Sequence, residues 1–260
     1  MSGLKGNKIS QLMAKWLPGA VMTTRWLLSQ GYSAQLLQTY TQNGWIKLLG
    51  KGAYSRLEET VEWPGALNAL QTQLHLPVHL GGISALEHYG LAQNVPFTVD
   101  TFYVFNTTER KHKLPRWFLA NFPGSVYLQY HLFDTDVAVD TVSINQLPVL
   151  VSAPERAILE VLALVPHAFD YEDAVNLVEN CRLARADIFQ TLLENCLSIK
   201  VKRLFLYLAD KCQLPTFKDL NIETLELGTG SRTIGEGGEY IPAYQLIVPR
   251  LAYHEGAGHV

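Results

Sequence analysis

The stretch that decides the fold runs from Pro18 to Leu57 and reads PGAVMTTRWLLSQGYSAQLLQTYTQNGWIKLLGKGAYSRL. Hydroxyl side chains suited to helix N-caps, and glycines suited to helix ends, predict two short helices separated by a tight turn. The predicted helices are residues 24–30 after the cap Thr23, ended by Gly31, and residues 34–43 after the cap Ser33, ended by Gly44.

A hairpin is predicted directly after the second helix. Two strand-like runs, residues 45–49 and 53–57, are separated by Gly50-Lys51-Gly52, as in a hairpin turn. This order is typical of a winged helix-turn-helix, whose second helix enters the major groove of DNA. The fold class predicted for the chain is therefore α+β, with an N-terminal winged helix-turn-helix domain followed by a mixed α/β C-terminal domain.

Charge is distributed unevenly along the chain. The first 57 residues hold seven Lys/Arg and no Asp/Glu, whereas the rest holds the other 14 Lys/Arg and all 24 acidic residues. For a polyanionic partner, local charge matters more than the net charge of −3. The acid-free region therefore favours double-stranded DNA as the partner of the predicted winged helix.

The second helix has two different sides. Leu36, Leu37 and Tyr40 recur at helical spacing and are expected to face the core. The opposite side carries uncharged amides and hydroxyls, which either read base edges, since Gln and Asn pair bidentately with adenine, or are merely solvated. The side chains expected to approach bases are Gln35, Gln38, Thr39, Gln42 and Asn43. Those expected to hold phosphates are Arg25, Lys47, Lys51 and Arg56.

The residue pattern of the chain changes near residue 92. This change predicts a winged-helix domain over residues 1–92 and an α/β domain over residues 93–260. Strand-like runs rich in β-branched and aromatic residues come first in the second part, and helical patterns follow. The runs are residues 99–105, 126–133 and 142–151; the helices begin near Pro154, Tyr171, Ala186 and Ile199.

A second basic cluster lies between the first two of these runs. Arg110, Lys111 and Lys113 stand in a predicted loop shortly before Trp117. This loop either extends a nucleic-acid surface or is a solvated turn.

A third basic cluster opens a late helix. Lys200, Lys202 and Arg203 follow the predicted cap Ser198, in a first turn where positive charge opposes the helix dipole. The placement indicates either a phosphate or acidic partner or a salt bridge to Glu194.

Catalytic signatures are scarce. The chain has no Walker sequence, no Gly-x-Ser-x-Gly and no His-Glu-x-x-His, so we expect no catalytic residue, no cofactor and no resident metal. Asp134, Asp136 and Asp140 can in principle hold Mg²⁺ as nuclease carboxylates do, although an acidic loop is the simpler interpretation. The alternative function is a winged helix fused to a metal-dependent nuclease-like domain.

Composition indicates a cytoplasmic protein with no membrane partner. No run of 18 apolar residues predicts a transmembrane helix, and Lys15 interrupts the apolar N-terminal stretch, unlike a signal peptide. The three cysteines, Cys181, Cys196 and Cys212, lack metal-binding spacing, which suggests reduced thiols.

Short segments spread over nearly the whole chain carry a family resemblance. They are GWI at 44–46, GAYSR at 52–56, WPGAL at 63–67, HLGGISAL at 79–86, LPRW at 114–117, PERAILE at 154–160, SIKVKRLF at 198–205 and LGTGSR at 227–232 with YQL at 244–246. In this order and spacing they resemble the AbiEi family, the antitoxins of bacterial type IV toxin–antitoxin and abortive-infection systems.

The resemblance implies an N-terminal domain that represses its own operon by binding repeats in the promoter. It also implies a C-terminal domain that relieves the toxicity of a cognate nucleotidyltransferase toxin encoded next to it, without a stable complex between the two. The resemblance assigns no catalytic residue to this chain. A third hypothesis is an interaction module in which the winged helix binds a protein.

Overall fold

The computed structural model describes residues 8–92, 101–129 and 131–250. Contacts divide the chain into two compact units. The first comprises the described residues of Met1–Leu80, Thr98–Tyr130 and Val139–Val151, and the second those of Gly81–Phe97, His131–Ala138 and Ser152–Val260. The chain enters each unit more than once, and the domain boundary expected near residue 92 stays a prediction.

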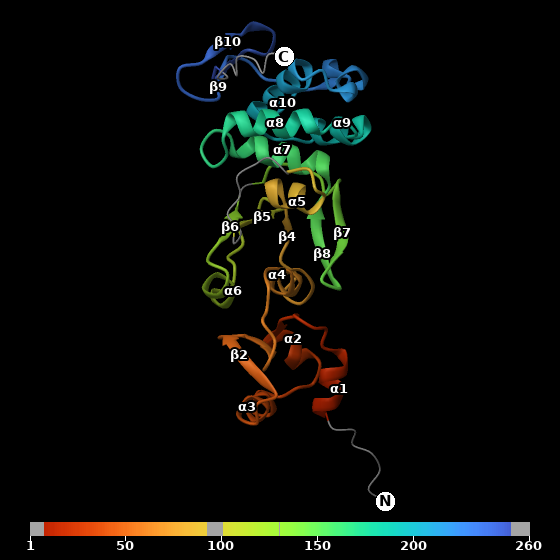
Figure 1. Cartoon of the computed structure of the whole chain (residues 1–260), viewed down its shortest axis with the longest axis vertical. Coiled ribbons are helices and arrows are strands. Elements are labelled where there is room, and N and C mark those ends of the chain that lie inside the picture. The colour runs from red at the N-terminus through yellow and green to blue at the C-terminus, as the bar shows by residue number, and fades with distance from the viewer. Residues whose placement is uncertain (1–7, 93–100, 130, 251–260) are drawn as a thin grey trace, which may run out of the picture. The chain divides into compact units, whose positions relative to one another are not determined.

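The first unit begins with a winged helix-turn-helix (Figure 1). Thr23 accepts a hydrogen bond from the Trp26 backbone N–H at 3.3 Å, and Ser33 accepts one from that of Leu36 at 3.2 Å, so both predicted N-caps are confirmed. The sheet has the order β1-β3-β2, and its first strand is a two-residue segment that the sequence did not predict. The elements are α1 (Lys8–Lys15), β1 (Met22–Thr23), α2 (Thr24–Ser29), α3 (Ala34–Gln42), β2 (Ile46–Gly50) and β3 (Ala53–Arg56).

The core of the winged helix is apolar and closely packed. Each of its helices turns one apolar stripe inward, as the spacing of these residues requires. The Trp16 indole N–H donates to the carbonyl of Ala20 at 2.8 Å, so its single polar atom is paired. The main buried side chains are Ile9, Leu12, Trp16, Leu27, Leu37, Tyr40 and Ile46.

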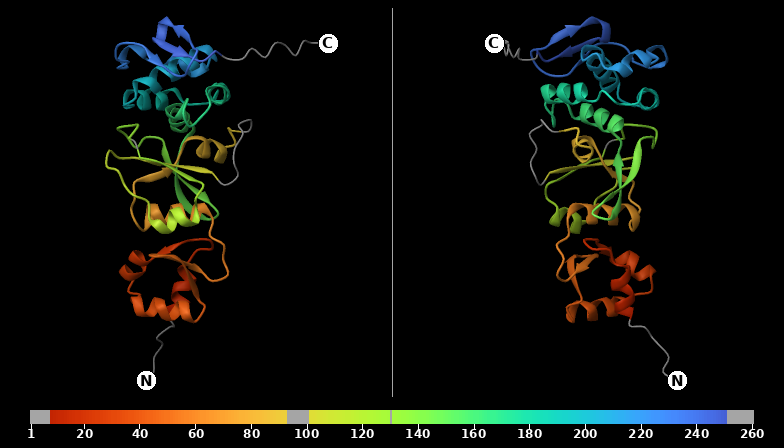
Figure 2. Two further views of the ribbon diagram at one scale, coloured as in Figure 1. Left: turned by 90° about the vertical axis from the view of Figure 1, so that its left-hand side faces the viewer. Right: turned by 45° about the vertical axis from the view of Figure 1, so that its right-hand side comes forward.

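A five-stranded mixed sheet completes the first unit, in the order β6-β5-β4-β8-β7. Strand β4 is antiparallel to β5 and parallel to β8, and β5 is parallel to β6. Helices α4 and α6 lie along the same side of this sheet (Figure 2). The elements are α4 (Trp63–Thr72), β4 (Val78–Leu80), β5 (Phe102–Asn106), α6 (Arg116–Asn121), β6 (Ser125–Leu128), β7 (Val139–Ile144) and β8 (Leu147–Ser152).

Helix α4 connects the winged helix to this sheet through buried amide side chains. Gln71 donates to the carbonyls of Val78 and Leu150, at 3.0 and 3.2 Å. Gln73, just after the helix, accepts from the Thr23 N–H at 2.7 Å and donates to Val21. Buried amides are stabilising only when they are paired in this way.

The second unit consists mainly of helices, with a small sheet of order β10-β11-β9 near the end of the chain. The caps Asp170 and Ser198 are confirmed by hydrogen bonds to backbone N–H groups of the first turns that follow them. The three cysteines are free thiols. The elements are α5 (Gly82–His88), α7 (Pro154–Leu164), α8 (Tyr171–Asn180), α9 (Ala186–Glu194), α10 (Ile199–Lys211), β9 (Arg232–Thr233), β10 (Glu239–Ile241) and β11 (Leu246–Val248).

A buried ion pair lies in α7. The Arg156 Nε donates to Glu160 at 3.2 Å, and the guanidinium also donates to the carbonyls of Thr135 and Val137. Glu160 in turn accepts from the Ser152 hydroxyl at 2.8 Å. Each charge therefore has several hydrogen-bond partners, as a buried ion pair requires.

The prediction of one strand over residues 142–151 is wrong. The segment is a hairpin, β7 and β8, which turns at Asn145 and Gln146 with φ values of 51° and 66°. Two successive left-handed residues make a tight hairpin turn, and Gln is not one of the residues that signal such a turn. The sequence also did not predict helix α6, which begins at Arg116 directly after the basic loop.

Candidate nucleic-acid interface

Helix α3 presents the polar face that its sequence predicts. Leu37 and Tyr40 are buried in the core, whereas all five residues expected to approach bases are exposed. The Thr39 hydroxyl donates to the Gln35 carbonyl at 3.0 Å, within the helix itself. The exposed residues are Gln35, Gln38, Thr39, Gln42 and Asn43. Their contact with bases stays a prediction.

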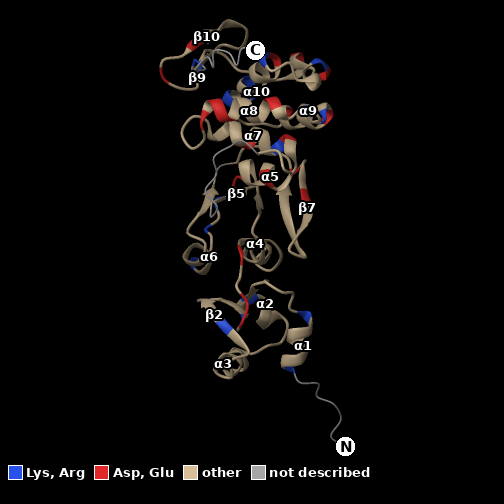
Figure 3. Ribbon diagram, in the orientation of Figure 1, with Lys and Arg blue, Asp and Glu red and all other residues tan. Residues whose placement is uncertain are grey.

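Two of the expected phosphate-binding cations are exposed on the elements before and after α3. Arg25 lies on α2, and Lys51 lies at the hairpin tip between β2 and β3. Figure 3 shows basic residues on the winged helix, and acidic residues in the segment that leads from it to α4. Residues 8–57 contain no Asp or Glu, so the local charge around Arg25 and Lys51 favours a polyanion.

The other two cations, Lys47 and Arg56, hold the hairpin in place. Arg56 pairs with Glu59 at 3.1 Å and also donates to the carbonyls of Met13 and Trp16, near the end of α1. The half-buried Lys47 donates to the Glu59 carbonyl at 3.0 Å. Because these contacts occupy both side chains, we omit them from the proposed phosphate contacts.

The basic segment Arg110–Arg116 is the surface formed by Arg110, Lys111, Lys113 and Arg116, all of which are exposed. It belongs to the same compact unit as the winged helix. Arg116 also belongs to the LPRW segment that carries the family resemblance.

The third basic cluster does not form a surface, so that expectation is wrong. Lys202 and Arg203 are buried, at 3% and 2% exposure, and Lys200 is half-buried. Lys200 donates to the carbonyls of Ala163 and Val165, and burial lowers the pKa of its ammonium.

Arg203 serves the C-terminal segment instead. Its guanidinium donates to the carbonyls of Leu227, Gly228, Gly230 and Gln245, at 2.6 to 3.3 Å. Lys202 donates to that of Glu226 at 3.2 Å. The partners of these three side chains are therefore backbone carbonyls, and not phosphate or the predicted Glu194. These hydrogen bonds offset the unfavourable interaction of positive charge with the helix dipole in the first turn of α10.

The part of the chain that the structure describes gives no support to the nuclease-like alternative, which would need carboxylates that hold a metal ion. Asp134, Asp136 and Asp140 are exposed. Within residues 8–92, 101–129 and 131–250, no three His, Cys, Asp or Glu side chains gather in a way that would hold a metal ion. Among those same residues, no helix combines the length and apolar character needed to cross a membrane.

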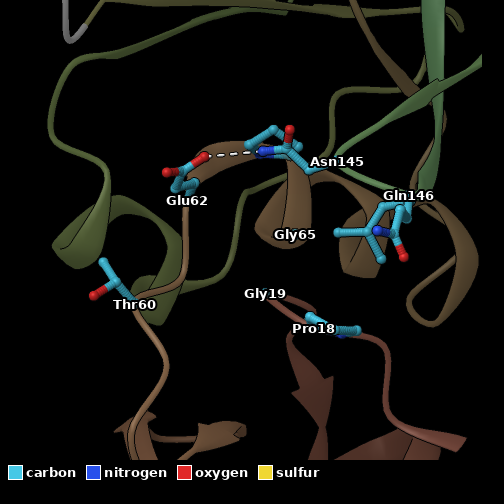
Figure 4. A pocket seen from close by; sticks show the side chains of 9 residues that line it. Pro18, Gly19, Thr60, Glu62, Gly65, Asn145 and Gln146 are labelled. Atoms are coloured by element: carbon cyan, nitrogen blue, oxygen red, sulfur yellow. Dashed lines mark hydrogen bonds between the residues drawn. The ribbon is translucent and has the colours of Figure 1, made fainter.

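Two cavities of the first unit meet at Glu62, ahead of α4. One, of about 380 Å³, is lined by Pro18, Glu62, Asn145 and their neighbours, and the Asn145 amide donates to Glu62 at 3.0 Å (Figure 4). The other, of about 550 Å³, is lined by Trp63, Phe102 and further residues. Among the described residues that line these two cavities, Glu62 is the only ionisable one, so these residues offer no acid–base pair.

Comparison with protein families decides the class of the chain. Residues 103–249 match the family described as transcriptional regulator, AbiEi antitoxin, type IV toxin–antitoxin system, and residues 5–97 match its N-terminal domain. The chain belongs to the AbiEi antitoxin family. AbiEi antitoxins are transcriptional regulators of type IV toxin–antitoxin systems, so the family resemblance of the sequence is confirmed.

The fold of this AbiEi chain also occurs in a solved structure, that of the RV2827C protein from Mycobacterium tuberculosis. The two share 18% sequence identity with a TM-score of 0.61, over 93% of this chain and 89% of that one. At this identity the likeness establishes the fold alone. No curated protein matches the chain.

Proposed function

We propose that this AbiEi chain represses its own operon by placing α3 in the major groove at repeats in the promoter. The observation that carries the proposal is the exposed, uncharged amide face of α3 within a region free of acidic residues. Gln and Asn side chains on such a face can each make a bidentate pair with adenine, worth about 1–3 kcal/mol of discrimination.

Backbone contacts supply most of the affinity in this proposal. Arg25 and Lys51 lie on either side of α3 in the chain and are exposed. The basic segment Arg110–Arg116, in the same unit, adds four exposed cations. Together they allow about six phosphate contacts, within the range that makes binding strongly dependent on salt.

A promoter–reporter assay tests the base-reading part. Replacing Gln38 and Gln42 by Ala should raise expression from the chain's own promoter about tenfold or more, because both amide contacts to bases are lost. The control is Gln129→Ala, which removes an exposed glutamine outside the winged helix and should leave repression intact. Full repression by the double variant would refute α3 as the reading helix.

We further propose that the chain neutralises a nucleotidyltransferase toxin encoded by the adjacent gene. The family membership supports an antitoxin role, while the class of toxin rests on the resemblance described above. Co-expression should restore the growth of toxin-producing cells, and the double variant of Gln38 and Gln42 should restore it equally, because base reading is not needed for it. Failure of the wild-type chain to restore growth would refute this second role. Co-purification would show whether a stable complex forms.

A further inference from the structure

The hairpin of the winged helix does not stand free of the rest of the first unit. Its strand β2 meets α6, whose Asn121 amide donates to the Leu49 carbonyl at 2.9 Å. The same amide donates to the Trp117 carbonyl at 2.7 Å, so its orientation is fixed from within α6. One side chain therefore holds the backbone of the hairpin two residues before Lys51.

Gly50 brings the two backbones still closer together. A Cβ atom added to Gly50 would lie 2.9 Å from the Trp117 Cβ and 3.3 Å from its Cα. Real Cβ atoms essentially never come within 3.0 Å of another atom, so any residue other than glycine would force the two backbones apart here. The register of β2 against β3 also shifts between Leu48 and Gly50, the kind of irregularity that redirects the residues after it.

Helix α6 is itself anchored. Trp117 and Phe118 are buried, at 3% and 0% exposure, and Phe118 packs edge-on against Phe102 of β5 with ring centroids 6.1 Å apart. Through α6 the hairpin is thus tied to the five-stranded sheet. The hairpin lies in the segment matched by the N-terminal family domain, whereas α6 lies in the segment matched by the antitoxin region.

We propose that α6 holds the hairpin in the position in which Lys51 meets DNA, with Asn121 and Gly50 as positioning residues that do not touch DNA. This inference rests on the proposed function. A hairpin that is already placed loses less conformational freedom on binding, which is the usual gain from preorganisation. Weakening the contact with α6 should therefore lower DNA affinity without removing any phosphate contact.

The test compares Asn121→Ala and Gly50→Ala with Lys51→Ala and with Leu119→Ala, an exposed residue of α6. Two quantities are measured: hydrogen exchange of the hairpin amides in the protein alone, and affinity for promoter DNA across salt. Asn121→Ala should speed exchange in β2 and weaken binding about threefold to tenfold, the loss expected for one hydrogen bond, with an unchanged salt dependence. Gly50→Ala should act in the same direction.

The two controls separate positioning from contact. Lys51→Ala should lower the salt slope by about one unit and leave hairpin exchange unchanged, while Leu119→Ala should change neither. Wild-type exchange and affinity in Asn121→Ala would overturn the proposal, and so would a lower salt slope in that variant. If the wild-type protein shows no promoter preference, the proposed function fails, and hydrogen exchange alone then decides whether α6 holds the hairpin.

Discussion

Arginine side chains join segments of this protein that are far apart in the sequence. The Arg56 guanidinium donates to Met13, 43 residues away, and that of Arg203 donates to Gln245, 42 residues away. Guanidinium suits this role because it carries five donors and is more weakly hydrated than an ammonium. Both residues therefore contribute to stability rather than to a basic surface.

Replacing Arg56 by Ala should destabilise the winged helix by about 1–3 kcal/mol, because carbonyls of α1 lose a charged donor. Chemical denaturation monitored by tryptophan fluorescence measures the change. Lys51→Ala, at an exposed site, should stay within about 0.5 kcal/mol of the wild type. Unchanged stability of the Arg56 variant, together with a weaker salt dependence of DNA binding, would instead make Arg56 a phosphate contact.

Replacing Arg203 by Ala should have a larger effect, about 3 kcal/mol or more, since four backbone carbonyls lose their donor in a buried site. Limited proteolysis should then cut between Leu225 and Val248 at lower protease concentrations. Arg182→Ala is the matched control, because its side chain is 55% exposed and should matter little. Equal resistance of both variants to protease would contradict the structural role of Arg203.

At the scale of elements, the β7–β8 turn carries strain that a single substitution can relieve. Gln146 has φ of 66°, a conformation that costs a residue with a Cβ about 1 kcal/mol. Gln146→Gly should therefore raise the free energy of unfolding by about that amount, as measured by denaturation. Gln146→Ala keeps the Cβ and should give no gain; an equal gain in both variants would refute the argument.

The contact between α7 and the start of α9 makes stability dependent on pH. Burial alone would raise the pKa of Glu155, but hydrogen bonds from the Arg185 side chain and backbone outweigh it and hold the pKa below its usual value. A depressed pKa stabilises the folded state above the unfolded pKa, about 4.3, and this stabilisation is lost as the pH falls through the folded pKa.

Denaturation of the wild type and Glu155→Gln between pH 7 and pH 3 tests this contact. The free energy of unfolding should fall more steeply in the wild type as the solution is acidified. Glu179→Gln, which alters an exposed carboxylate, should follow the wild-type curve. Parallel curves for the wild type and Glu155→Gln would show that the contact does not control the acid response.

Local signals in the sequence predicted much of the fold. Thr23, Ser33 and Asp170 cap the helices expected of them, because a cap depends on a few neighbouring residues. The Asn145–Gln146 turn escaped prediction because Gln gives no local sign of a left-handed conformation. The polar face of α3 was likewise found from helical spacing alone.

Roles that depend on distant partners were not predictable in this way. Lys202 and Arg203 read as a basic patch in the sequence, yet their partners lie beyond residue 225 in the chain. Nor does the sequence show that Gly50 meets Trp117, since only the folded unit brings these residues together. Surface and interior cations look alike until their long-range contacts are known.

At the scale of the whole molecule, the net charge of −3 is unevenly distributed, because the first 57 residues carry seven Lys/Arg and no Asp/Glu. This division fits a chain that unites a regulator and an antitoxin, as its family does. Because steering depends on the local field, the acidic remainder need not prevent the winged helix from reaching DNA.

The most direct test of the central claim is binding of the purified protein to a duplex carrying its own promoter, compared with a scrambled duplex, across salt concentrations. With about six phosphate contacts, the log–log slope should be near −5, so affinity for the promoter should fall about a thousandfold between 50 and 200 mM salt. We expect clear preference for the promoter together with this steep slope. Equal and weak binding to both duplexes would contradict recognition of the promoter by α3.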